Sequence, residues 1–127
     1  MEKKTLILIG LLIFCSVGSA LTYDVVKVDR CRAMAYNSEL SQTDKDPFTT
    51  AAGTRPKWGT VAANHLSLWT RLKIEGFGNK IFVVEDRHNK RHHKIIDIWF
   101  PNRKAAVKFG VRNVKYWVLK NVRPLPN

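Results

Sequence analysis

Short apolar runs, separated by turn signals at intervals of roughly ten residues, constrain the fold of this chain more than any other feature. The clearest run is Arg71–Glu75, where charged and apolar residues alternate as in a strand with one buried face. Turn residues at 76–79 then lead into a second run, Lys80–Glu85. The other segments expected to be extended are Tyr23–Val28, Ala33–Asn37, Phe48–Gly53, Ile95–Phe100 and Val111–Leu119. So many short strands predict a mainly β protein, built as a small closed barrel.

One short helix is predicted between the last two strands. Pro101 ends the strand before it, and the Asn102 side chain can cap the first amides of Arg103–Phe109. Gly110 follows, at the position where glycine commonly ends a helix. This segment therefore carries both a start and a stop signal.

The N-terminus has the pattern of a secretory signal peptide. Two lysines precede the apolar segment Thr5–Val17, and Gly18-Ser19-Ala20 follows with small residues where cleavage is expected. We therefore predict a signal peptide at residues 1–20, a single mature domain at 21–127, and export to the periplasm, cell wall or medium. The alternative is an uncleaved anchor, because the uncharged stretch Thr5–Tyr23 is just long enough to span a bilayer. After cleavage we expect no stable membrane insertion.

The chain is strongly basic, with a formal net charge of +12. Such a balance favours a polyanionic partner or surface, which for an exported protein indicates anionic lipid or an acidic cell-wall polymer rather than nucleic acid. Cleavage would leave Cys31 as the single cysteine, so an internal disulfide is excluded and the domain must depend on its packed core. We expect a monomer.

Two aspartates stand out against this background. Asp86 closes an apolar run, and Asp97 interrupts the run Ile95–Trp99. A carboxylate among apolar residues is costly to bury unless it is paired or protonated, and such groups are often functional. The basic loop Arg87–Lys94 lies between them, which suggests an acid/base site beside a surface that attracts anions.

Each aspartate also has a plainer interpretation. Strand alternation puts Ile95, Asp97 and Trp99 on one face, where desolvation would raise the pKa of Asp97 as a general acid requires. Equally, Asp97 could pair with a nearby Arg or His and only organise the loop. Asp86 by itself could be a solvated turn residue or form a salt bridge to Arg87.

Other candidate residues give weaker signals. His88, His92 and His93 have no recognised metal-ligand spacing, so we expect neither a metal nor another cofactor. Trp58 and Trp69 could stack on sugar rings or simply pack at the barrel rim. The sequence contains no phosphate-binding glycine loop, nucleophile elbow or Cys/His pair, which argues against nucleotide chemistry and against serine or cysteine nucleophiles.

Taken in order, several segments resemble the 3D (Asp-Asp-Asp) domain family. The matching segments are Ala35–Asn37, Thr49–Thr54, Gly59–Asn64, Leu66–Ile74, Phe77-Gly78, Val83–Arg87, Ile96–Phe100 and Ala106–Gly110. The resemblance spans residues 33–119. It also extends to the catalytic domain of membrane-bound lytic transglycosylase A and to stationary-phase survival and resuscitation-type muralytic proteins.

The resemblance implies a six-stranded double-psi β-barrel with one or two short helices. It also implies cleavage of the β-1,4 bond between N-acetylmuramic acid and N-acetylglucosamine in peptidoglycan, with a 1,6-anhydro product. The family's second and third aspartates fall on Asp86 and Asp97, and its first falls on Asn64. An amide exchanges no proton at neutral pH, so Asn64 can only hold substrate or orient an aspartate. Trp69 stands where the family has a glycine.

On this basis, Asp97 is the expected general acid/base, with Asp86 tuning or orienting it. The expected substrate-binding residues are Asn64, Thr50, Gly53 and Arg87. The expected partner is the peptidoglycan glycan strand. The alternative hypothesis is a non-catalytic cationic module that binds peptidoglycan on the same barrel.

Overall fold

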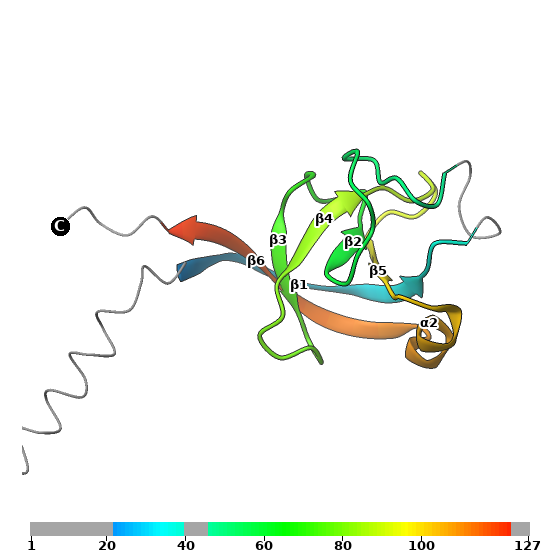
Figure 1. Ribbon diagram of the computed structural model, residues 1–127. Helices are drawn as coiled ribbons and strands as arrows, with labels where there is room; N and C mark the ends of the chain where they lie inside the picture. Colours follow the sequence, from blue (N-terminus) through cyan, green and yellow to red (C-terminus); the bar gives the residue numbers. More distant parts are fainter. Residues whose placement is uncertain (1–21, 40–45, 123–127) are drawn as a thin grey trace, which may run out of the picture. The chain divides into compact units, whose positions relative to one another are not determined.

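Six β-strands close into a mixed barrel in the computed structural model, which describes residues 22–39 and 46–122 (Figure 1). In chain order the elements are β1 (Thr22–Tyr36), β2 (Thr60–Ala62), β3 (Arg71–Ile74), β4 (Phe82–Asp86), β5 (Ile95–Trp99), α2 (Arg103–Phe109) and β6 (Arg112–Val122). Around the barrel the strands follow the order β1-β5-β2-β4-β3-β6. The predicted small, mainly β barrel of six strands is therefore confirmed, with α2 as the one helix of the described residues.

The barrel combines parallel and antiparallel pairs. Strand β1 runs parallel to β5 and β2 runs parallel to β4, whereas β2–β5, β3–β4 and β3–β6 are antiparallel. The main unit comprises Val25–Lys120, and the described residues outside it are the outer ends of β1 and β6. The predicted signal peptide, 1–20, lies outside the described residues.

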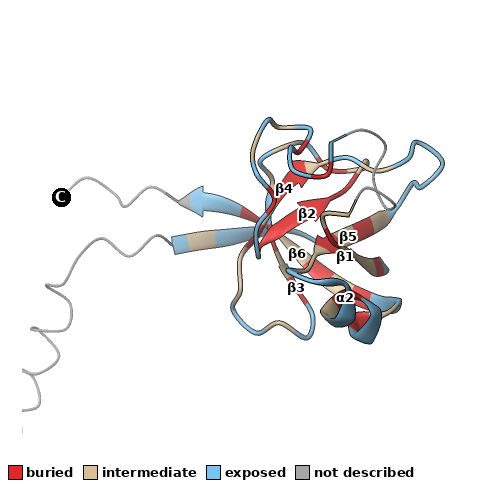
Figure 2. Cartoon of the chain, turned by 45° about the vertical axis from the view of Figure 1, so that its right-hand side comes forward, coloured by how far each residue is buried: buried red, intermediate tan, exposed pale blue. Residues whose placement is uncertain are grey.

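Strand alternation builds the core. In β3 the side chains of Leu72 and Ile74 are buried, while Arg71 is exposed, as the alternating pattern predicts. Phe82 and Val84 of β4 also point into the barrel and are fully buried. Figure 2 shows the buried residues concentrated in the strands, with the loops largely exposed or intermediate.

Helix α2 begins and ends where its capping residues predict. The Asn102 side chain accepts a hydrogen bond from the Ala105 amide at 2.8 Å, and Gly110 ends the helix with φ of +68°. The helix buries Ala106 and Phe109. Phe109 stacks on Phe77, with ring centroids 5.8 Å apart, which fixes the helix against the aromatic end of the core.

Two sequence-based expectations are wrong. The segments Tyr23–Val28 and Ala33–Asn37 were expected as separate strands, but one strand, β1, runs through both and ends at Tyr36, because no glycine or proline interrupts the backbone between them. The segment Phe48–Gly53 is a series of turns rather than extended chain. Hydrogen bonds between Thr50 and Thr54 close its last turn.

Candidate active site

A β-bulge places the two aspartates in one row across the barrel. Ala62 of β2 pairs with Asp97 of β5 on one side and with Asp86 of β4 on the other. The register of β2 and β4 shifts between Val61 and Ala62, so that Glu85 is passed over. Without this shift, Asp86 would move to the opposite face of the sheet, since side chains alternate along a strand.

The row also sets the spacing between the two aspartates. Two steps between neighbouring strands separate their Cα atoms by roughly 10 Å, and both side chains leave the same face. The residue between them is Ala62, whose methyl group occupies little space there. Two carboxyl groups can therefore face a common ligand from either side of Ala62.

Asp97 shares one face of β5 with Ile95 and Trp99, as strand alternation predicts. Its neighbours Ile96 and Ile98 are fully buried in the barrel core. Its Oδ1 atom is buried and has no hydrogen-bond partner among the described residues. Burial raises the pKa of the Asp97 carboxyl, the charges of His88 and His92 oppose this rise, and the Asp86 charge adds to it.

Asp86, at the end of β4, is held by three hydrogen bonds. Its Oδ1 atom accepts from the backbone amides of Ala51 at 3.0 Å and Arg87 at 2.9 Å. Its Oδ2 atom accepts from the Tyr36 hydroxyl at 3.2 Å. Both of its oxygens are thus engaged, whereas one oxygen of Asp97 is not. The two carboxyl groups therefore occupy different environments, as an acid paired with an orienting group requires.

Tyr36 is a site residue that sequence reasoning missed. It lies at the end of β1, paired with Trp99, and donates its hydroxyl proton to Asp86. Burial first, and then the charge of Asp86, raise the pKa of Tyr36 far above its usual value, so the phenol stays protonated as a donor. The only sequence signal was its place in the Ala35–Asn37 segment, which indicated no role for the phenol.

Asn64 organises the basic loop. Its Nδ2 atom donates to the backbone carbonyls of His88 at 2.9 Å, Asn89 at 3.0 Å and His92 at 3.3 Å. Its Oδ1 atom accepts from the His88 amide at 3.2 Å. These hydrogen bonds fix the loop that carries His88 and His92 near Asp97.

Arg87 fastens the same loop from its first residue. Its Nη1 atom donates to the carbonyl oxygens of Ala63 and Leu66, the latter at 2.8 Å. The guanidinium group is therefore turned toward the protein backbone rather than toward open solvent. Substrate binding by Asn64 and Arg87 stays a prediction.

Thr50 and Gly53 shape the turn that orients Asp86. The Thr50 hydroxyl lies 2.7 Å from the Thr54 hydroxyl and accepts from the Thr54 amide at 3.0 Å. Gly53 has φ of +81°, a conformation that glycine adopts without strain. The turn lies against β4 because Ala51 donates to the Asp86 side chain and Ala52 donates to the Glu85 carbonyl. Both predicted residues therefore contribute indirectly to the placement of Asp86.

A hollow of about 280 Å³ lies beside the ends of β1 and β5. Trp99, two residues beyond Asp97, lines it together with Ser38, whose hydroxyl accepts from the indole nitrogen at 2.9 Å. Phe48 and Arg55 also line it. Neither Asp86 nor Asp97 lines this hollow.

Two further observations bear on the chemistry. In residues 22–39 and 46–122, no group of three His, Cys, Asp or Glu side chains is arranged to hold a metal ion. Within the same ranges, no helix has the length and apolar character needed to cross a membrane.

Comparison with protein-family models and with curated proteins gives no match for this chain. The resemblance to the 3D domain family therefore stays a prediction.

Proposed function

We propose that the protein is a secreted lytic transglycosylase-like enzyme that cleaves the β-1,4 bond between N-acetylmuramic acid and N-acetylglucosamine in peptidoglycan. The observation that carries this proposal is the strand pairing in which Asp97 and Asp86 lie on either side of Ala62. A partly desolvated carboxyl with a raised pKa and an oriented second carboxyl are the two groups that glycosidic bond cleavage uses.

In this proposal Asp97 is the acid and then the base. Its protonated carboxyl gives a proton to the leaving glycosidic oxygen as the bond to the muramyl anomeric carbon breaks. The resulting carboxylate takes the proton of the muramyl 6-hydroxyl as that oxygen bonds to the same carbon. The product is a 1,6-anhydro sugar, and no water is consumed. Asp86, held by Tyr36, faces the positive charge that develops on the sugar ring.

The cationic surface would support this reaction by concentrating substrate. A formal net charge of +12 attracts an anionic wall polymer, an effect that weakens as salt screens it. The predicted signal peptide would deliver the protein to that polymer.

Mass analysis of muropeptides is the direct test. Purified peptidoglycan is incubated with the protein at several pH values, and the masses of the soluble fragments are determined by mass spectrometry. Fragments with anhydro-muramyl ends support the proposal. Fragments with ordinary reducing ends indicate a hydrolase instead, and release no higher than in buffer refutes cleavage altogether.

A non-catalytic peptidoglycan-binding module is the second candidate. It is favoured by Asn64, which supplies an amide where the resembling family has its first aspartate. In that case insoluble peptidoglycan would retain the protein at low salt and release it at high salt. The Asp97→Asn variant would be retained as well as the native protein, and neither would release muropeptides.

A further inference from the structure

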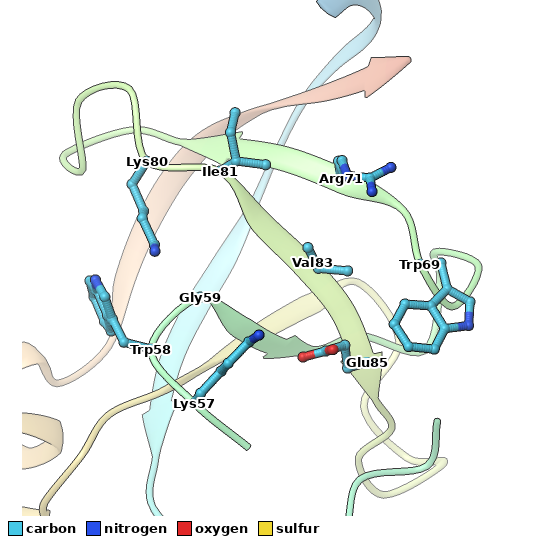
Figure 3. A pocket seen from close by; sticks show the side chains of 9 residues that line it. All are labelled: Lys57, Trp58, Gly59, Trp69, Arg71, Lys80, Ile81, Val83 and Glu85. Atoms are coloured by element: carbon cyan, nitrogen blue, oxygen red, sulfur yellow. The ribbon is translucent and has the colours of Figure 1, made fainter. Parts of the chain in front are cut away.

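A groove of about 320 Å³ lies over β4, separate from the hollow beside Trp99. Figure 3 shows Trp58 and Trp69 at opposite ends of this groove, with Val83 and Glu85 of β4 between them. Both indole side chains have large exposed fractions, 40% for Trp58 and 54% for Trp69. The groove therefore offers two aromatic surfaces to a ligand.

The backbone at Trp69 is held in an unfavourable conformation. Its φ of +72° makes it the one non-glycine residue with positive φ among the described residues. The Trp69 amide donates to the Val84 carbonyl at 2.6 Å, which fixes this geometry against β4. Because the indole is mostly exposed, packing does not compensate for the strain. Strained backbone conformations of this kind cluster at ligand-binding and active sites.

Trp58 is a rigid surface at the other end. Its ring packs on Phe77, Phe82 and Phe100, with centroid distances of 5.8, 5.6 and 5.3 Å. The Lys80 ammonium lies 6.0 Å from the centroid of the same ring. An indole held in this way loses little conformational entropy when a ligand stacks on it.

Three cationic side chains and one buried carboxylate line the groove. Lys57, Arg71 and Lys80 line it, and none forms an ion pair within the described part of the chain. Glu85 is only 5% exposed and accepts a hydrogen bond from the Thr60 hydroxyl at 2.7 Å. The groove thus offers donors to an anionic group and a fixed acceptor to a hydroxyl.

We propose that this groove binds an acidic saccharide. A sugar ring would stack on the Trp69 indole, the lysines would hold a carboxylate on the sugar, and Glu85 would accept a sugar hydroxyl. A phosphodiester chain fits less well, because the buried Glu85 carboxylate would repel it. This inference deepens the proposed function and rests on it only in one respect, namely that Glu85 directly precedes Asp86, so the same glycan strand could occupy both sites.

The test measures binding apart from cleavage. The full-length chain carrying Asp97→Asn is titrated, by calorimetry, with a tetrasaccharide of alternating N-acetylglucosamine and N-acetylmuramic acid. The same tetrasaccharide with its carboxyls converted to amides is the matched ligand. We expect the acid to bind roughly tenfold more tightly than the amide. Equal binding of the two, or tighter binding of a single-stranded DNA oligonucleotide, overturns the inference.

Variants assign the binding to the groove. In the same background, Trp69→Gly should weaken binding of the acid at least tenfold while leaving the melting temperature unchanged or higher, because glycine adopts positive φ without strain. Lys80→Ala should remove most of the preference for the acid over the amide. Lys104→Ala, an exposed lysine on α2, is the matched control and should change neither.

Each negative result identifies which idea has failed. Unchanged affinity in both Trp69→Gly and Lys80→Ala overturns the groove as the binding site. Carboxylate-dependent binding without muropeptide release by the native protein refutes the proposed enzyme and leaves the groove intact.

Discussion

Asp86 and Asp97 share one face of the barrel because their strands pair with the same residue, Ala62, from opposite sides. The bulge that passes over Glu85 makes this arrangement possible. A single-residue shift of this kind reverses which side chains reach a given face. The relation between the two carboxyl groups is therefore a property of strand register.

Replacing Asp97 by asparagine should abolish muropeptide release and preserve the fold. The amide has nearly the same shape but cannot donate or accept the proton, so we expect about a thousandfold loss of rate. The rate of anhydro-muropeptide release checks this, with circular dichroism to verify folding. Asp24→Asn, an exposed position on β1, is the control and should retain full activity.

The raised pKa of Asp97 predicts a defined pH dependence of activity. The general acid must be protonated, so the rate should fall as pH rises through the raised pKa of Asp97. A pH profile of initial rates would show this descending limb. A rate that is level from pH 4 to pH 8 would contradict the assignment.

The same shift predicts how stability depends on pH. A carboxyl whose pKa is higher in the folded state binds more protons when folded, so its stabilising contribution is present below the ordinary value of 3.8 and is lost as pH rises through the folded value. The native free energy of unfolding should therefore fall relative to that of Asp97→Asn as pH is raised. Urea denaturation of both proteins at pH 4 and pH 7 measures the difference. A constant difference would show that the pKa is not raised.

Tyr36→Phe should weaken catalysis through Asp86. Removing the hydroxyl leaves the Asp86 Oδ2 atom without its donor, so we expect the free energy of unfolding to fall by about 1 kcal/mol. The rate constant kcat should fall about tenfold while KM changes little, because orientation is lost rather than a substrate contact. The pH profile should also shift, since the Asp86 charge acts on Asp97. Tyr23→Phe, on the outer end of β1, should alter none of these.

Asn64→Asp should lower the stability of the protein, even though it introduces the residue that the resembling family has at this position. The Asn64 amide donates to three backbone carbonyls. A carboxylate has no proton to donate, so its oxygens would repel these carbonyl oxygens. We expect the free energy of unfolding to fall by about 2 kcal/mol and amide exchange to increase across residues 88–92. Chemical denaturation and hydrogen exchange measure these effects.

Asn89→Asp is the control within the same loop. The Asn89 side chain accepts from the Arg91 amide at 3.0 Å, and a carboxylate can accept that bond equally well. Its stability should match that of the native protein. If Asn64→Asp is as stable as the native protein, the Asn64 hydrogen bonds do not stabilise the loop.

Local signals in the sequence predicted much of the fold correctly. The alternation in Arg71–Glu75 and the capping residues Asn102 and Gly110 each depend on neighbours within a few positions, and the structure confirms them. The placement of Asp97 on the strand face opposite Ile96 and Ile98 was also predicted, because side chains alternate along a strand. The turn at Phe48–Gly53 was missed because its closing bonds come from Thr54 hydroxyl and backbone groups, which leave no periodic pattern.

The sequence by itself determined the kind and approximate limits of β3, β4, β5, α2 and β6, and the two carboxylates that a chemical function would use. Tertiary structure alone decided how those carboxylates are related, because a register shift between β2 and β4 has no local signature. It also decided the role of Tyr36, whose partner Asp86 lies 50 positions away in the chain. The strained Trp69 is a similar case, since its positive φ depends on a hydrogen bond to another strand. Interactions between distant segments are formed by folding, and only the folded barrel contains them.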